Sequence, residues 1–297
     1  MKSVKAMLRG GLGNQCFIYA VARSIAVHHC AKVLLNLDYM EDDKVFKRKC
    51  ALDAFCCEYT TELTKSRWVR MFEKMRYKMV SRLAKKVGRL YFDKRPAAYW
   101  GLPSGDIESV VLDGYWQSEK YFYDCRDTLL ADFALRDNSW IKEDNLASQI
   151  KQEPESMFLH VRSYKEVPGR ENGECALRLV RYYNDALAYV SANVARAKVF
   201  VFSDDVEWAK ANILNTVTMR SHLNFVFNNS QSSQIRDFTL MRLCKHGIVA
   251  DSSFSWWAGW LGEQERRVIG ERPLRIRVNR RVMNDDFWPE RWVAIDE

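Results

Sequence analysis

The sequence predicts an α/β protein built on parallel sheets. Short apolar segments with strand-like alternation are repeatedly followed by longer segments with helical periodicity. The first strand also runs into a glycine-rich turn, "RGGLGNQ", that opens a helix. Both features are typical of sheets whose strands are joined by crossover helices.

The first half begins with a strand–helix–strand unit. We expect a strand over residues 2–9, a helix over 14–30 and a second strand over 32–38. A right-handed crossover makes the two strands parallel. Further along, residues 109–122 read as a strand that enters an aromatic and polar loop, and residues 121–133 as another helix.

The second half is more regular. A polar stretch over 142–156 separates it from the first and predicts a domain boundary, giving domains of residues 1–150 and 151–297. Strands and helices then alternate, which predicts a doubly wound parallel sheet. The strands are expected at 157–161, 198–202, 224–227, 247–250 and 267–270, and the helices at 175–194, 205–214, 231–244 and 253–262.

The glycine-rich turn almost matches a dinucleotide-binding fingerprint. Gly11 and Gly13 occupy the first two glycine positions, and Asp38 is the acid expected to bind a ribose. Cys16 stands at the third position, and the second half holds no Tyr/Lys or cysteine arrangement suited to hydride transfer. An NAD(P)-dependent oxidoreductase therefore stays an alternative that these departures disfavour.

Composition indicates a globular, reduced protein. Of 297 residues, 47% are apolar and 28% are charged, and no run approaches 18 consecutive apolar residues. The first residues lack the apolar core of a signal peptide. Eight cysteines form no C-x-x-C pair, and five scattered histidines show no metal-ligand spacing. We therefore expect a cytoplasmic protein without a metal or other cofactor.

The net charge of +8 comes from one basic segment, residues 65–95. Its twelve Lys and Arg residues face two acids, so the rest of the chain carries about −2. Apolar residues recur there at three- or four-residue steps, as on one helix face: Trp68, Phe72, Met75, Met79, Leu83 and Val87. Two interpretations stay open, a surface helix packed on the core and a cationic helix resting peripherally on the cytoplasmic face of the inner membrane. No nucleic-acid-binding module accompanies the segment, which disfavours nucleic acid.

Polar residues follow three strands of the second half. Because ligands of open α/β sheets bind outside the carboxyl ends of the strands, these residues should converge. Arg162 suits a phosphate, and the helix that starts near Ser253 offers N–H groups to another. The expected nucleotide-phosphate group comprises His160, Arg162, Ser203, Asp204, Asp205, Asp251, Ser252 and Ser253.

Each of these residues also has a structural alternative. Ser252 is suited to a simple helix N-cap, and His160 to a histidine satisfied within the core. Arg162 could serve only to pair with Asp204. The convergence of three loops at one edge is what favours the nucleotide interpretation.

An ordered set of motifs resembles the bacterial α-1,2-fucosyltransferases of glycosyltransferase family 11. The motifs are "RGGLGNQCFIYA", "DGYWQSEKYF", "LHVR", "FVFSDDVEWAK", "LMRLCKH" and "DSSFSWWAGWL". The resemblance implies a GT-B-type α/β architecture, with two Rossmann-like domains whose parallel sheets face a cleft. It also implies a metal-independent, inverting transfer of fucose from GDP-fucose to the 2-hydroxyl of a terminal galactose in a surface glycan, such as O-antigen or capsule.

The resemblance also assigns residues. Arg162 falls on the arginine that acts on the donor pyrophosphate, and His160 lies beside it near the nucleoside. The run Ser252, Ser253, Phe254 and Ser255 falls on the part that lines the diphosphate, in the GDP-fucose-binding domain with Ser203 and Asp204. Gly11, Gly13 and Asn14 fall on the turn of the acceptor-side domain that faces the donor, with Asn14 and Arg162 as the catalytic residues.

One motif departs from the family pattern. The usual H-x-R-R-x-D reads "HVRSYK" here, with Ser163 and Lys165 at the altered positions and Glu166 next. This keeps open a catalytically weak sugar-nucleotide-binding protein. The motifs name no base for the acceptor hydroxyl, for which Asp38, Asp113 and Glu119 are candidates.

Overall fold

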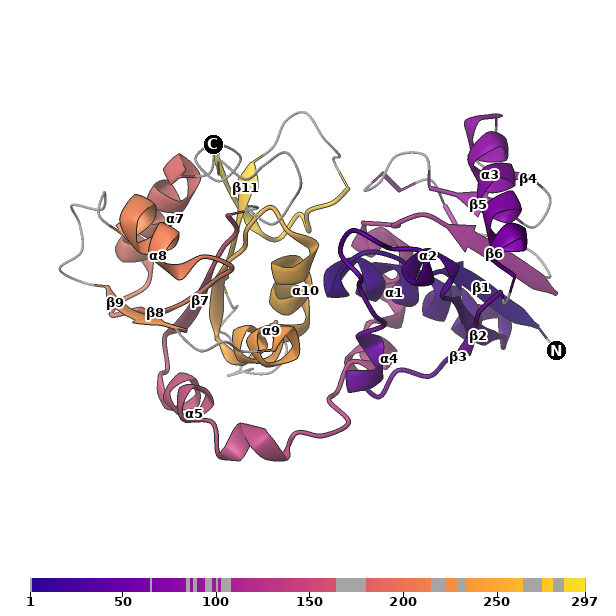
Figure 1. The fold of residues 1–297 in the computed structure, drawn as a ribbon. Coiled ribbons are helices and arrows are strands. Elements are labelled where there is room, and N and C mark those ends of the chain that lie inside the picture. Colours follow the sequence, from indigo (N-terminus) through magenta and orange to yellow (C-terminus); the bar gives the residue numbers. More distant parts are fainter. Residues whose placement is uncertain are drawn as a thin grey trace. The chain divides into compact units, whose positions relative to one another are not determined.

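The chain forms two compact units, shown in a computed structural model (Figure 1). The structure describes residues 2–64, 66–83, 86–87, 90–93, 98–99, 101–102, 108–163, 180–214, 223–228, 233–263, 274–279 and 286–296. Unit 1 comprises Met1–Arg136 and Val282–Pro289, and unit 2 comprises Asp137–Arg281 and Glu290–Glu297.

The division lies earlier than the sequence predicts, at residues 136/137 rather than 150/151. The polar stretch holds helix α5 (Asn145–Gln152), which belongs to unit 2. Asp144 caps α5 and accepts a hydrogen bond of 2.6 Å from Arg236 Nε, on a later helix of the same unit. Hydrophilic composition marked this stretch as a linker, but a charged side chain ties it to unit 2.

Unit 1 is a mixed sheet with helices. Its sheet has the order β3-β2-β1-β6-β5-β4, and all its pairs are parallel except β4–β5. The strands are β1 (Ser3–Met7), β2 (Lys32–Asn36), β3 (Thr60–Glu62), β4 (Lys86–Val87), β5 (Leu90–Phe92) and β6 (Ser109–Asp113). The helices are α1 (Leu12–His29), α2 (Asp38–Glu41), α3 (Arg67–Leu83) and α4 (Arg126–Asp132), with short 3₁₀ turns at Leu52–Ala54, Glu119–Tyr121 and Tyr123–Cys125.

Unit 2 is an all-parallel sheet with the order β12-β11-β10-β7-β8-β9. Its strands are β7 (Ser156–Val161), β8 (Lys198–Ser203), β9 (Asn224–Phe227), β10 (His246–Ile248), β11 (Arg275–Asn279) and β12 (Val293–Asp296). Besides α5, its helices are α7 (Val180–Asn193), α8 (Val206–Ala209), α9 (Gln234–Leu243) and α10 (Ser253–Gly262), with a 3₁₀ turn at Ser139–Lys142 and a π turn at Lys210–Leu214. The predicted α/β class with two Rossmann-like units is therefore confirmed.

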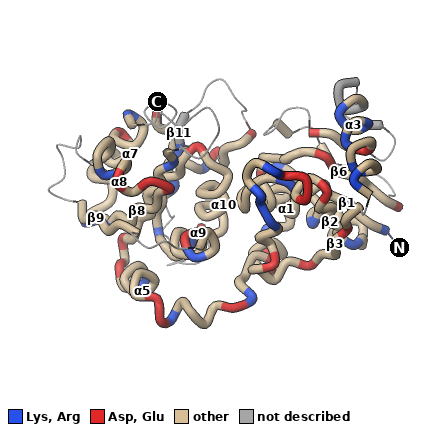
Figure 2. The backbone as a smooth tube through the Cα atoms, in the orientation of Figure 1, with Lys and Arg blue, Asp and Glu red and all other residues tan. Residues whose placement is uncertain are grey.

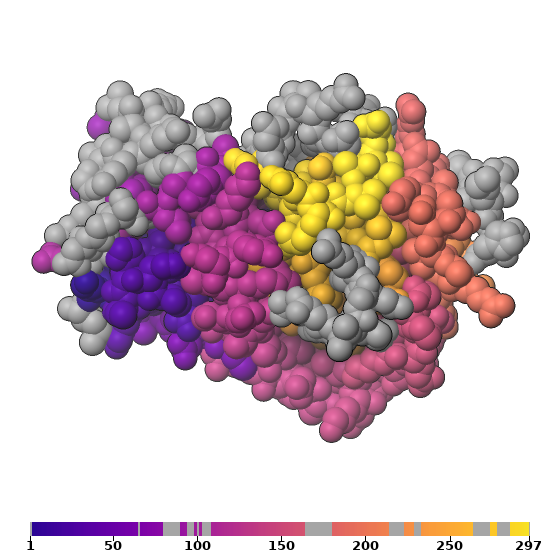
Figure 3. All heavy atoms as spheres, turned by 180° about the vertical axis from the view of Figure 1, so that it is seen from behind, coloured from indigo at the N-terminus to yellow at the C-terminus, as the bar shows by residue number. Residues whose placement is uncertain are grey.

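The central elements of unit 2 are mostly apolar because they are buried. Every residue of β7 is buried, as expected for a central parallel strand covered on both faces. Helix α10 is buried from Ser255 to its end, and Trp256 packs against Trp292 with ring centroids 5.7 Å apart. The segment that carries Trp292 thus lies against α10 within unit 2. The chain's last residues are yellow in Figure 3.

Several predicted elements differ from the observed ones. The helix expected over 205–214 is split into α8 and a π turn, and that over 121–133 reduces to 3₁₀ turns followed by α4. Val87 lies in β4 rather than on the helix of the basic segment. The strand expected over 267–270 lies outside the described residues. None of the described helices is long and apolar enough to cross a membrane.

Candidate functional site

Each sheet has one position where the strand order reverses. In unit 2, β8 and β9 extend from one side of β7, whereas β10 pairs with the other side. In unit 1, β2 and β6 flank β1 in the same way. Ligands of open α/β sheets bind beyond the strand carboxyl ends at such switch points. The residues after β7 and β10, and those after β1 and β6, are therefore the candidates.

Arg162 and Asp204 lie together beyond β7 and β8. Arg162 Nη1 donates to Asp204 Oδ2 at 2.8 Å, and the backbone N–H of Ser163 donates to Asp204 Oδ1 at 2.7 Å. The Arg162 side chain stays 24% exposed. The ion pair considered from sequence thus exists, and it holds the guanidinium in a fixed direction while part of it reaches solvent. A guanidinium fixed in this way can bind a phosphate in addition to its carboxylate partner.

His160 is a neutral histidine at this switch point. It is 6% exposed, and its ring centroid lies 5.6 Å from that of Phe254 in α10. Burial, reinforced by the charge of Arg162, lowers its pKa to about 4. Its Nδ1 has no hydrogen-bond partner within the described part of the chain. His160 therefore packs as a core residue, yet it keeps a buried polar atom that a ligand could satisfy.

The N-terminus of α10 brings the serine run to the same place. Ser252 Oγ accepts a hydrogen bond of 3.3 Å from the Phe254 N–H, so Ser252 is the N-cap. Ser252, Ser253 and Phe254 are partly exposed. Ser255 is fully buried, and its hydroxyl points back to the carbonyls of Ala250 and Ser252, at 3.5 and 3.4 Å. The expected diphosphate contact from Ser255 is thus not supported, because its hydroxyl bonds within its own turn.

The polar residues after β8 mainly shape their own loop. Ser203 Oγ accepts from the Asp205 N–H at 3.0 Å, which closes a small turn. Asp205 Oδ1 accepts from the Trp208 N–H at 2.8 Å and so caps α8. Asp204 turns toward Arg162.

In unit 1, the glycine turn meets the loop after β6. Asn14 Oδ1 accepts a hydrogen bond of 2.8 Å from Gln117 Nε2, which links the start of α1 to that loop. Gly11 is the extended N-cap of α1, and a Cβ added to it would meet no atom within 4 Å. Gly13 is buried in the first turn of the helix. Asn14 and Gly11 therefore lie at the switch point of unit 1.

Gly10, which the sequence analysis did not single out, sets the backbone of this turn. Its φ of +80° is a conformation that side-chain-bearing residues rarely adopt, and an added Cβ would lie 2.7 Å from Asn14 Nδ2. The side chain of Gln15 holds the turn in place. Its Nε2 donates to the carbonyls of Gly10 and Lys49, both at 3.0 Å, and its Oε1 accepts from the Ala51 N–H at 2.8 Å. A glutamine in the variable part of a glycine motif gives no signal of this role.

Arg9 and Asp113, at the ends of β1 and β6, form an ion pair that the sequence analysis also missed. The Arg9 guanidinium lies over two rings, 4.6 Å from the centroid of Tyr39 and 5.2 Å from that of Tyr115. Burial, together with the Asp113 charge, raises the pKa of Tyr39 to about 12, so its hydroxyl stays protonated. The pairing joins residues 104 positions apart, which no local pattern indicates.

The three candidate bases have different surroundings. Asp38 is 3% exposed, and its two oxygens accept from the N–H and the hydroxyl of Thr64, both at 2.8 Å. Both oxygens of Asp38 are thus engaged by Thr64 in the interior of unit 1. Asp113 lies at the switch point in its pair with Arg9, and Glu119 lies on the following 3₁₀ turn. Lys165 and Glu166 fall outside the described residues.

One group of described residues could geometrically hold a metal ion, His28, Asp124 and Cys125. His28 lies in the last turn of α1, at the opposite end of the helix from the glycine turn. The group is accordingly separate from the switch point of unit 1.

Comparisons with known proteins identify the family. The model of glycosyl transferase family 11 matches residues 102–293. The chain is 28% identical to an α-1,2-colitosyltransferase of Escherichia coli over the full length of both chains. It is 24% identical to galactoside α-(1,2)-fucosyltransferase 1 of Sus scrofa, over 63% of this chain and 53% of that protein.

A solved structure supports the fold. A mutant of Arabidopsis thaliana FUT1 in complex with GDP aligns with a TM-score of 0.52 at 13% identity, covering 88% of this chain and 69% of that one. The oxidoreductase alternative does not fit these findings. With its two switch-point sheets and its matched motifs, the chain belongs to glycosyl transferase family 11.

Proposed function

We propose that this glycosyltransferase moves fucose from GDP-fucose, with inversion, to the 2-hydroxyl of a terminal galactose in a surface glycan. Both relatives carry an α-1,2 linkage in their names, and one is a galactoside fucosyltransferase. The observation that carries the donor assignment is the grouping of Arg162, His160 and the α10 N-terminus at the unit 2 switch point. This combination suits a nucleoside diphosphate.

The chemistry requires stabilisation of a leaving diphosphate. As the sugar–phosphate bond breaks, positive charge develops on the sugar and negative charge on GDP. Preorganised hydrogen-bond donors aimed at that negative charge lower the barrier. Arg162, held by Asp204, and the N–H groups at the start of α10 are such donors. In the proposed mechanism these groups stabilise the leaving GDP without a metal ion.

Neutral His160 is assigned to the nucleoside side of the donor. An imidazole with a depressed pKa keeps one donor and one acceptor nitrogen at neutral pH, and it adds no charge to a site that already holds Arg162. Its contact with Phe254 places an aromatic face beside it, to which a base or ribose can pack. Ser252 and Ser253 are assigned to the diphosphate, with Ser203 and Asp204 at its margin.

Unit 1 is assigned to the transferred sugar and the acceptor. Gly11, Gly13 and Asn14 form the contact turn, and Asn14 is the catalytic residue of this unit. The open space at Gly11 fits close approach of a ligand to backbone. Asp113 and Glu119 are the two remaining base candidates, since Asp38 is occupied by Thr64.

The α-1,2-colitosyltransferase gives a second candidate function, because it matches this chain along its whole length. Colitose is fucose without the 3-hydroxyl, so either sugar could occupy one subsite. Fucose is the proposed donor sugar, and GDP-colitose is the donor to be compared with it. The proposal also includes a peripheral position on the cytoplasmic face of the inner membrane through the basic segment 65–95.

The test is a donor screen with the purified chain. GDP-fucose, GDP-colitose, UDP-galactose and NADH are offered with a galactose-ended acceptor in the presence of EDTA, and the product linkage is determined by NMR. An α-1,2-fucosylated product supports the proposal. If only GDP-colitose supports transfer, the donor is GDP-colitose and not GDP-fucose. Loss of transfer in EDTA would refute metal independence.

A matched pair of variants checks the site. Arg162→Ala should lose nearly all transfer, whereas Lys151→Ala, on an exposed residue of α5, should retain it. Binding of GDP-fucose without turnover in the unaltered chain would instead support the sugar-nucleotide-binding alternative.

A further inference from the structure

Helix α3 turns its apolar stripe toward solvent. Trp68, Phe72, Met75 and Met79 are 70, 60, 63 and 61% exposed. Their spacing of four, three and four residues puts them on one face of the helix. The stripe itself therefore does not pack on the core. Single exposed apolar residues are common on protein surfaces, but a continuous row of large ones usually marks an interaction surface.

The opposite face of α3 is the one that packs on unit 1. Tyr77 is 6% exposed and packs in a cluster with Met7 and Phe92. Arg70, one turn before Lys74, is 8% exposed. The residues that contact the core thus include an arginine and a lysine, and this is the reverse of an ordinary surface helix.

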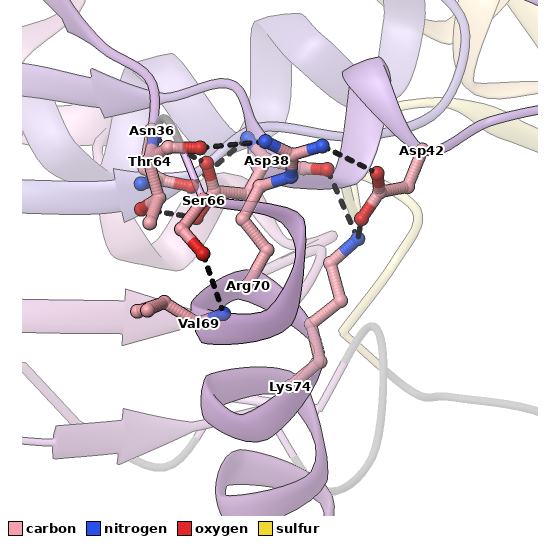
Figure 4. Close-up of polar contacts among 8 residues, drawn as sticks. All are labelled: Asn36, Asp38, Asp42, Thr64, Ser66, Val69, Arg70 and Lys74. Atoms are coloured by element: carbon pink, nitrogen blue, oxygen red, sulfur yellow. Dashed lines mark hydrogen bonds and ion pairs between the residues drawn. The ribbon is translucent and has the colours of Figure 1, made fainter.

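Figure 4 shows how polar contacts fix this orientation. Arg70 donates to the Thr64 carbonyl at 2.6 Å and to Asp42 Oδ1 at 3.1 Å. Lys74 Nζ donates to Asp42 Oδ2 at 2.5 Å and to the Asp38 carbonyl at 2.9 Å. The hydrogen bond from Lys74 lowers the pKa of Asp42, so the ion pair persists at neutral pH. Turning the apolar stripe inward would break these contacts and bury the charges.

Basic residues flank the exposed stripe. Arg67 and Lys78 lie on one side of it and Arg76 on the other, by the 100° helical step, and all three are exposed. The only acid on the helix, Glu73, pairs with Arg76 at 2.9 Å. Figure 2 shows the Lys and Arg positions along α3. An apolar row with cationic flanks is complementary to a surface with an anionic outer layer and an apolar interior.

We infer that α3 lies in the headgroup layer of an anionic phospholipid membrane. Trp68, Phe72, Met75 and Met79 insert into the boundary of the acyl region, and Arg67, Arg76 and Lys78 contact lipid phosphates. This inference deepens the peripheral membrane contact of the proposed function by naming the lipid chemistry and the inserting residues. The charge of the segment favours lipid over an uncharged apolar partner. Its twelve basic residues against two acids attract anionic headgroups, even though Arg70 and Lys74 are paired with Asp42, whereas an uncharged surface gives no such attraction.

The test is vesicle co-sedimentation of the full chain. Vesicles of phosphatidylethanolamine with phosphatidylglycerol are compared with vesicles of phosphatidylcholine alone, at about 0.05 M and about 0.5 M salt. We expect binding to the anionic vesicles at low salt, at least tenfold weaker binding to phosphatidylcholine, and partial release at high salt. If the protein stays in the supernatant with anionic vesicles at both salt concentrations, the inference is wrong.

Matched variants locate the contact. Phe72→Ser with Met75→Ser changes only exposed side chains, so the fold should persist, and we expect at least a tenfold loss of vesicle binding. Val45→Ser, on an apolar residue that is 68% exposed and outside α3, is the control and should bind as the unaltered chain does. Equal binding by the double variant and the control would overturn the assignment to α3.

Two further readouts separate the alternatives. Transfer to a soluble acceptor should be unchanged in the double variant, so a failure of the donor proposal and a failure of membrane binding appear in different assays. Sedimentation velocity without lipid reports self-association. A dimer that the double variant dissociates, with no vesicle binding in any lipid, would show that a second copy of the chain covers the stripe instead.

Discussion

Arg162 and Asp204, 42 positions apart in the chain, meet through a 2.8 Å ion pair beyond the ends of two adjacent parallel strands. Asp204 also accepts the backbone N–H of Ser163, so it fixes both the side chain of Arg162 and the backbone that follows. Where the family motif commonly has a second arginine, this chain has a serine that is 1% exposed. Arg162 is therefore the guanidinium on which the proposed phosphate contact depends.

Replacement of Arg162 should affect catalysis more than folding. Arg162→Ala should lower kcat/KM by about 100-fold or more, because a preorganised donor to the leaving group is lost. Arg162→Lys keeps the charge but lacks the bidentate fork, so its kcat/KM should lie between that of the alanine variant and that of the unaltered chain. Steady-state kinetics with a soluble acceptor measures both, and a Tm within a few degrees of the unaltered chain shows that the fold is intact. Nearly full activity of the alanine variant would contradict the leaving-group role.

His160 should make folding stability depend on pH. Its folded pKa of about 4 lies below the ordinary value of 6.5, so the unfolded chain binds more protons between these two pH values. Its contribution is complete above pH 6.5 and is lost as the pH falls toward 4, by about 3 kcal/mol in all. Urea unfolding at pH 7.5 and pH 4.5 should show a smaller loss for His160→Gln than for the unaltered chain. Other titrating groups contribute equally to both proteins, so the difference between them isolates His160. Equal losses of unfolding free energy in the two proteins would contradict the prediction.

Gly10 and Gly11 should respond differently to a methyl group. Gly10→Ala forces a residue with Cβ to a φ of +80°, 2.7 Å from Asn14 Nδ2, and should cost about 1–2 kcal/mol of stability. Gly11→Ala meets no atom and keeps an extended backbone, so it should lose only the N-cap preference of glycine over alanine and lower the Tm less than Gly10→Ala does. If the turn contacts substrate, Gly11→Ala still raises KM. A Gly11→Ala enzyme with unaltered kinetics would remove Gly11 from the substrate contact.

The acids of unit 1 should separate into a structural one and a functional one. Asp38→Ala leaves the N–H and hydroxyl of Thr64 without their acceptors and should destabilise the chain by about 2–3 kcal/mol in urea unfolding. Asp113→Asn and Glu119→Gln should fold, and the variant that has lost the base should lose kcat with a flattened acidic limb of the pH–rate profile. If neither variant changes that limb, the base lies elsewhere.

The elements with a strong local pattern could be predicted from the sequence. The bounds expected for β9 and α10 are those observed. Polar residues bound the apolar run of β9, and the N-cap Ser252 marks the start of α10. Helix α3 shows the limit of the same reasoning. Periodicity correctly grouped Trp68, Phe72, Met75 and Met79 on one face, but it could not tell which face meets the core. That choice depends on the contacts of Arg70 and Lys74 with Asp42 and with the Thr64 carbonyl. Asp42 is distant in the chain, and Thr64 lies before the helix, so the periodicity of the helix contains neither.

The candidate site was partly predictable for a similar reason. The rule for strand ends placed Arg162, Asp204 and the serine run together because all strands of unit 2 are parallel. It could not foresee that Ser255 turns its hydroxyl to Ala250. Nor could it foresee that Arg9 pairs with Asp113, since that contact depends on the register of β1 against β6.

The return of the chain to unit 1 near its end affects the order in which the protein can form during synthesis. Asp286 accepts hydrogen bonds from Lys120 Nζ at 2.6 Å and from the Tyr99 N–H at 2.7 Å, and the Phe287 ring lies 6.1 Å from that of Phe17 in α1. The ribosome makes these two residues only after nearly all of unit 2. The nascent N-terminal unit therefore waits, with part of α1 uncovered, until residues 286 and 287 have been made. A chain released before that point would lack the segment that completes its first unit.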